Sequence, residues 1–217
     1  MMRMAGAVLV GAVTLLVVGC SSTSDGTASP APQNSTASQS VTSSPTESQS
    51  PSGSPLPHSG APAVSDPLPE SAVPEDPCDA FTREQIEYAL GDDAPEGERD
   101  DFVTGPVCVW QDSVSGATVW ASYSTKTREG LSSFYQNAQP RAQVWRELSP
   151  IGGFPAIAYQ AYEGETSCSV VIGVADDFAV TADAAPSRAK DGEIDPCEMA
   201  QDMAELLVEN LKERAGR

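Results

Sequence analysis

Four cysteines in roughly the last 140 residues constrain the fold of this chain more than any other feature. Cys78, Cys108, Cys168 and Cys197 are an even set that allows three pairings. The first two are 30 residues apart and the last two are 29 apart. Asp-Pro precedes the first and the last, each at a predicted helix start, while the middle two lie in predicted strands. This mirrored order favours Cys78–Cys108 and Cys168–Cys197, each worth about 3–4 kcal/mol of chain entropy.

The N-terminus indicates that the chain is exported, which is the condition under which disulfides persist. Arg3 precedes an apolar run over residues 5–18, which is shorter than the roughly 20 residues of a membrane span. Val-Val-Gly-Cys then ends at Cys20 and fits a bacterial lipobox. We therefore predict a signal peptide over residues 1–19, a diacylglycerol on Cys20, and a location on the extracytoplasmic face of the cell membrane. The alternative is an uncleaved anchor with an incidental cysteine.

A change in composition separates this anchor from a folded domain. Residues 20–75 consist largely of Ser, Thr, Pro, Ala, Gly and Gln and contain no aromatic residue. Such a segment cannot bury enough apolar surface to compensate for the entropy of ordering it, so we predict a disordered tether. Residues 76–217 remain, which is the length of one domain with one core.

Three helices are predicted from their caps. Thr82 and Gln85 form a capping box for a helix that runs to about Leu90. A second helix begins near Thr127, with apolar residues at helical spacing. Asp195 is the N-cap of the last helix, with Pro196 at its first position and Glu198 completing a capping box; its apolar face comprises Met199, Met203, Leu206, Leu207 and Leu211.

Strands occupy the intervals between these helices. We expect them over residues 107–111, 117–125, 143–148, 156–162, 167–175 and 178–182, with Gly and Asp pairs as breaks. The expected fold is α+β: an antiparallel sheet of five to six strands covered by helices, in the order α-β-β-α-β-β-β-α, with two disulfides. Trp110, Trp120 and Trp145 are expected to fill its core, with a surface for stacking a ligand as the alternative role of a tryptophan.

The charge of the chain excludes one class of partner. It holds 31 acidic and 12 basic residues, a net charge of −19, and nucleic acid requires a basic surface. The densest acidic run comprises Asp92, Asp93, Glu96, Glu98, Asp100 and Asp101. It lacks the alternating order of a calcium loop, so we interpret it as a solvated loop rather than a cation site.

No catalytic constellation is visible in the sequence. The single histidine, His58, lies in the predicted tether, and no Cys-x-x-Cys or Cys-His cluster suggests a metal or cofactor. The Ser-x-x-Lys run at residues 187–190 lacks the other motifs of penicillin-interacting enzymes. We therefore expect no catalytic residue, no metal ligand and no cofactor, although converging carboxylates remain an alternative that sequence alone cannot exclude.

The cysteine-centred motifs together resemble a known family. These are Asp76-Pro77-Cys78, Cys108-Val109-Trp110, the Gly-Gly-Phe-Pro-Ala turn at residues 152–156, Cys168 at a strand start and Asp195-Pro196-Cys197. The pattern resembles actinobacterial lipoproteins that carry the domain-of-unknown-function family 3558. The resemblance implies an exported, lipid-anchored domain and supplies no catalytic residue.

These observations lead to a functional expectation. We expect a non-catalytic binding or interaction module of the cell envelope, attached to the membrane through its lipid and contacting an envelope protein, glycan or lipid. The alternatives are a small carboxylate-dependent hydrolase and a structural accessory of a membrane complex.

Overall fold

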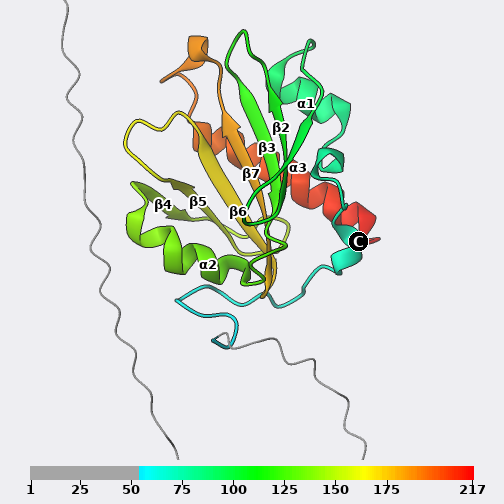
Figure 1. The fold of residues 1–217 in the computed structure, drawn as a ribbon, viewed down its shortest axis with the longest axis vertical. Coiled ribbons are helices and arrows are strands. Elements are labelled where there is room, and N and C mark those ends of the chain that lie inside the picture. Colours follow the sequence, from blue (N-terminus) through cyan, green and yellow to red (C-terminus); the bar gives the residue numbers. More distant parts are fainter. Residues whose placement is uncertain (1–53) are drawn as a thin grey trace, which may run out of the picture. The chain divides into compact units, whose positions relative to one another are not determined.

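The computed structural model describes residues 54–217 (Figure 1). Seven strands form one antiparallel sheet in the order β1-β2-β3-β7-β6-β5-β4. The strands are β1 (Glu98–Asp101), β2 (Pro106–Gln111), β3 (Thr118–Tyr123), β4 (Val144–Glu147), β5 (Ala156–Gln160), β6 (Cys168–Ala175) and β7 (Phe178–Ala185). The helices are α1 (Arg83–Leu90), α2 (Gly130–Asn137) and α3 (Pro196–Arg214). The expected α+β class is confirmed, with seven strands in place of five to six.

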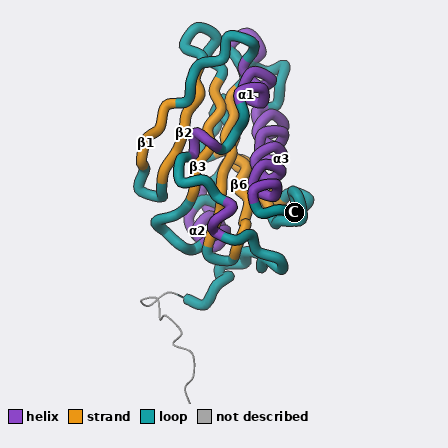
Figure 2. The backbone as a smooth tube through the Cα atoms, turned by 90° about the vertical axis from the view of Figure 1, so that its right-hand side faces the viewer, coloured by secondary structure: helices purple, strands orange, loops and turns teal. Residues whose placement is uncertain are grey.

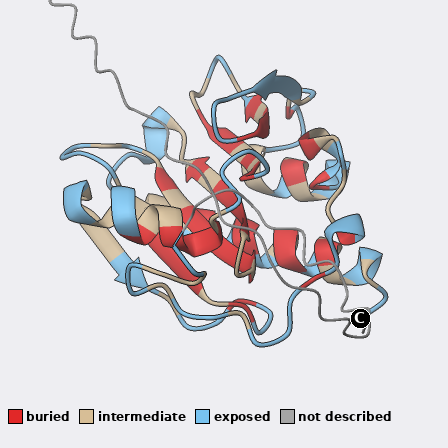
Figure 3. Cartoon of the chain, turned by 60° about the horizontal axis from the view of Figure 1, so that its bottom comes forward, coloured by how far each residue is buried: buried red, intermediate tan, exposed pale blue. Residues whose placement is uncertain are grey.

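The helices cover the two faces of the sheet unequally. Seen from the side, α1 and α3 lie together on one face (Figure 2). Apolar side chains of α3 and of every second strand position form the main core between these helices and the sheet. Figure 3 shows in red the buried residues of the strands and helices. On the opposite face a smaller cluster packs under α2, where Leu131 and Tyr135 contact Ile157, Val171 and Ala179. Helices thus cover the centre of one face, with its edge strands exposed, and only part of the other face.

Local capping chemistry explains where the helices begin. The capping box of Thr82 and Gln85 is confirmed. Asp195 caps α3 by accepting a hydrogen bond from the Cys197 amide at 2.8 Å, in place of the predicted box with Glu198. Helix α2 begins at Gly130, three residues later than expected, because Arg128 and Gly130 both have a left-handed backbone (φ 50°) and regular helical geometry follows only after them.

Strand β1 is the element that sequence analysis missed. All four of its residues are exposed and charged, and they belong to the acidic run interpreted above as a loop. The strand pairs with β2 through its backbone, with Glu98 opposite Val109 and Asp101 opposite Pro106. Charged side chains on an edge strand disfavour pairing with another chain, which explains a strand without apolar alternation.

Both predicted disulfides are present. Cys78–Cys108 joins the short 3₁₀ turn before α1 to β2, and Cys168–Cys197 joins the start of β6 to the first turn of α3. The second bond ties the sheet to its main covering helix.

The folded unit begins earlier than residue 76, which corrects the predicted boundary. Residues 54–75 lie along the lower end of the sheet (Figure 1). The amide of Leu68, a buried residue, donates to the Val174 carbonyl at 2.9 Å, and the amide of Val64 donates to the Asp176 carboxylate at 2.8 Å. The low hydrophobicity of this segment concealed its docking, which depends on a few apolar side chains and on backbone hydrogen bonds. We call residues 54–75 the strap.

The signal peptide, Cys20 and the rest of the predicted tether lie outside the described residues. Within residues 54–217, no helix combines the length and apolar character needed to cross a membrane.

Candidate functional site

The part of the sheet that α2 leaves uncovered contains a pocket. Its volume is about 360 Å³, within the usual range for small-ligand sites. It lies over β2, β3, β7 and the start of β6, and the loop between β5 and β6 forms one side. The lining residues are Gln111, Gly116, Thr118, Trp120, Glu165, Thr166, Ser167, Ser169, Asp183, Ala184 and Ala185.

Strand register places a row of functional side chains across this face. Residues that pair directly across neighbouring antiparallel strands point to the same side of a sheet. Trp120 pairs with Asp183, Asp183 with Ser169, and Ser169 with Tyr159. The row continues to Val109 and Glu98 on one side and to Trp145 on the other. Two polar residues therefore occupy the centre of the sheet between aromatic side chains.

Asp183 is the central group of the site. Its carboxylate accepts a hydrogen bond from the Ser169 hydroxyl, and no ion pair involves it within the described chain. Burial raises the pKa of Asp183 from its ordinary 3.8 to about 6; the hydrogen bond from Ser169 opposes this and the charge of Glu165 adds to it. A carboxylate with a strongly raised pKa in a pocket is typical of a functional group.

Aromatic residues lie on both sides of Asp183 along this row of the sheet, and Trp120 among them lines the pocket. Trp120 contacts Phe102 edge to face, with ring centroids 6.2 Å apart, and the Phe102 side chain is 42% exposed. On the other side Tyr159 packs against Phe134 of α2 and against Trp145. Burial, followed by the charge of Asp183, raises the pKa of the Tyr159 hydroxyl, which therefore stays protonated at neutral pH.

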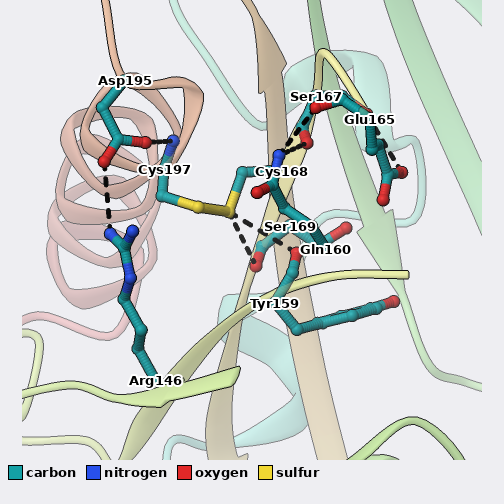
Figure 4. A network of polar contacts seen from close by, with 9 residues as sticks. All are labelled: Arg146, Tyr159, Gln160, Glu165, Ser167, Cys168, Ser169, Asp195 and Cys197. Atoms are coloured by element: carbon teal, nitrogen blue, oxygen red, sulfur yellow. Dashed lines mark hydrogen bonds and ion pairs between the residues drawn. A yellow bond between two sulfur atoms is a disulfide. The ribbon is translucent and has the colours of Figure 1, made fainter. Parts of the chain in front are cut away.

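Hydrogen bonds fix the loop between β5 and β6 beside the pocket (Figure 4). The Gln160 amide group donates to the carbonyl oxygens of Glu165 and Ser167 at 2.8 and 2.9 Å. The Glu165 carboxylate accepts from the Ala161 amide and from the Ser167 hydroxyl. The Cys168–Cys197 disulfide follows directly and holds the start of β6 against α3. This side of the pocket is therefore preorganised, which lowers the entropic cost of binding.

The residues that sequence analysis singled out lie elsewhere. Cys20 is outside the described residues. The acidic run forms β1 and the loop before it, while the Ser-x-x-Lys run at 187–190 is a short 3₁₀ turn beside the β2–β3 hairpin. No three His, Cys, Asp or Glu side chains among residues 54–217 are grouped so that they could hold a metal ion.

The central site residues were missed because β7 was predicted to end at Ala182. An aspartate normally marks the end of a strand, since its side chain is costly to bury. In the structure β7 continues through Asp183 to Ala185. Trp120, expected in the core, faces the pocket instead, whereas Trp110 is buried as predicted and Trp145 is partly covered by α2. The usable signal was the polar alternation of Thr181 and Asp183 along an otherwise apolar strand.

Fold and site together define a disulfide-bonded α+β domain with a pocket on an incompletely covered sheet. The chain belongs to the family described as "Protein of unknown function (DUF3558)", whose model matches residues 15–210. The matched residues include Cys20. No curated protein and no solved structure matches the chain.

Proposed function

We propose that the protein is a lipid-anchored binding module of the cell envelope, whose ligand site is the pocket around Asp183. The observation that carries the binding proposal is this pocket, in which a carboxylate without an ionic partner lies beside an accessible tryptophan. The anchoring proposal rests on the lipobox at Cys20 and on a family match that includes it.

The placement of the strap supports a division between an attached end and a binding end. The strap contacts Val174 and Asp176 at the end of β6, and the pocket contains Ser169 near the beginning of that strand. The seven steps along the chain from residue 169 to residue 176 span about 23 Å at ~3.3 Å per step. A chain tethered through the strap therefore presents its pocket at the end of the sheet away from the attachment point.

The anchor is tested by replacing Cys20. The proposal predicts that Cys20→Ser moves the protein from the membrane fraction to the soluble fraction, with its disulfides and fold intact by mass spectrometry and circular dichroism. Continued membrane association of a correctly exported Cys20→Ser protein would contradict lipid anchoring.

The binding site is tested by photo-crosslinking in intact cells. A photoreactive residue replaces Gln111, which lines the pocket, and a matched control replaces Glu198, an exposed residue of α3. We expect an adduct from position 111 that disappears with Trp120→Leu, and no such adduct from position 198. Equal adducts from both positions, unaffected by Trp120→Leu, would contradict a ligand site in the pocket.

A carboxylate-dependent hydrolase is the second candidate, because Asp183 and Glu165 line the same pocket and one has a raised pKa. Glu165 already accepts two hydrogen bonds that close its own loop, which favours binding over catalysis. Release of soluble fragments from cell-wall glycan by the wild type but not by Asp183→Asn would establish the hydrolase.

A further inference from the structure

We propose that the pocket binds a protonated amine carried on a hydroxylated molecule of about monosaccharide size, with Asp183 as its counter-ion. This proposal rests on the proposed function, because it names the ligand class of the same site. It follows from the charge, the aromatic wall and the polar lining of the pocket.

The first argument is the missing counter-ion. The Asp183 carboxylate receives a hydrogen bond from Ser169 alone among the described residues, and that donor is neutral. A half-buried carboxylate without a cation is unfavourable in the free protein, and burial does raise its pKa. A bound ammonium group supplies both the opposite charge and further hydrogen-bond donors.

The second argument is the charge around the pocket. The lining contains the acidic Asp183 and Glu165 and no Lys, Arg or His. Lys126 pairs with Asp101. Arg188 donates to the Val114 carbonyl and packs against Gly116, but its side chain is not part of the lining. Glu98 adds a further negative charge on the same row of the sheet. The two carboxylates in the lining therefore favour a cationic ligand over an anionic one.

The third argument separates an organic cation from a metal ion. Divalent cations take six to eight oxygen ligands or demand strict octahedral geometry, and the described residues provide no group of three candidate ligands. Trp120 instead offers an aromatic surface beside the carboxylate, the combination that attracts ammonium groups.

The remaining lining matches a hydroxylated carrier. Gln111 and Thr166 provide an amide and a hydroxyl that both donate and accept hydrogen bonds. The hydroxyls of Thr118 and Ser167 donate within the protein and still offer acceptor lone pairs. The volume of about 360 Å³ accommodates a small polar molecule, or one unit of a larger one.

The test compares two probes that differ only in the amine. Methyl glucosaminide and methyl glucoside have the same ring, and the first carries an ammonium group where the second carries a hydroxyl. Each is titrated into the full-length chain in neutral detergent, and binding is followed by the amide chemical shifts of the pocket residues. We expect the glucosaminide to bind at least about tenfold more tightly, as one charge-assisted hydrogen bond provides.

Two variants assign this preference to Asp183. Asp183→Asn keeps the shape and removes the charge, and it should abolish the roughly tenfold preference for the amine. Asp92→Asn makes the same charge change at an exposed position outside the pocket and should leave both affinities unchanged.

The outcomes separate this inference from the proposed function. Equal binding of both probes, unaltered by Asp183→Asn, would overturn the inference and leave a site for neutral glycans. If neither probe bound while solubilised envelope material still shifted the pocket resonances, the inference would also be overturned. The proposed function would then still stand. Only the absence of any pocket response to envelope material would contradict the proposed function itself.

Discussion

Replacing Asp183 by asparagine is expected to stabilise the protein at neutral pH. Burial raises the pKa of this carboxyl from 3.8 to about 6, and a difference of this size corresponds to about 3 kcal/mol at ~1.4 kcal/mol per pKa unit. Asparagine retains an oxygen that accepts the hydrogen bond from Ser169. Because part of the side chain faces the solvent in the pocket, we expect a gain of about 1–3 kcal/mol in the free energy of unfolding.

The dependence on pH has a definite sign. Since the folded protein binds the Asp183 proton more tightly than the unfolded chain, this residue makes stability fall as the pH rises from about 4 to about 6. Asp183→Asn removes this contribution. The free energy of unfolding of the variant should therefore be higher than that of the wild type at pH 7. This difference should shrink towards zero near pH 4.

Urea unfolding at several pH values between 4 and 7 measures both effects, with the slope m as a check that the unfolded state is unchanged. Asp92→Asn, at an exposed position, is the control and should stay within about 0.5 kcal/mol of the wild type. A loss of stability at pH 7 for Asp183→Asn, or a gain that persists at pH 4, would refute the conclusion that the ionised Asp183 carboxylate destabilises the folded protein.

Three further predictions concern the packing of the domain. Leu68→Ala should cost about 2–3 kcal/mol because this side chain of the strap is buried in the main core. No loss of stability in urea unfolding would show that docking of the strap does not stabilise the domain. Gly130→Ala should cost at least about 2 kcal/mol, since φ is +50° and the new Cβ would lie 2.3 Å from a backbone oxygen. Gly153→Ala, at φ +97° with no atom within 4 Å, should cost only about 1 kcal/mol, and equal losses would argue against the clash. Replacing Cys168 and Cys197 together by alanine should cost about 3 kcal/mol and weaken ligand binding, because the pocket loop loses its attachment to α3; unchanged binding would contradict that role.

The helices were predictable because their signals are local. Capping residues such as Thr82 and Asp195 satisfy backbone groups within a few residues of themselves, so a short stretch of sequence contains the whole interaction. The disulfide pairing was predictable from the mirrored Asp-Pro-Cys motifs. They place Cys78 and Cys197 at helix starts, and the strand cysteines Cys108 and Cys168 lie 30 and 29 residues away from them.

The site was not predictable, because it depends on which part of the sheet α2 leaves uncovered. Nothing local distinguishes Trp120 on the open face from Trp110 in the core, since both lie in alternating strands. Asp183 and Ser169 meet only through the pairing of β6 with β7. The strap escaped prediction in the same way, because Leu68 docks on a strand more than 100 residues later.

The most direct test of a ligand site on the open face is the indole N–H resonance of Trp120 in the full-length chain during titration with solubilised envelope material. Trp110 lies in the core and Trp145 is packed against Tyr135, so their indole signals serve as internal controls. We predict a saturable shift of the Trp120 signal, with the signals of Trp110 and Trp145 unchanged. Envelope material that binds the protein while the Trp120 signal stays unchanged would contradict the account.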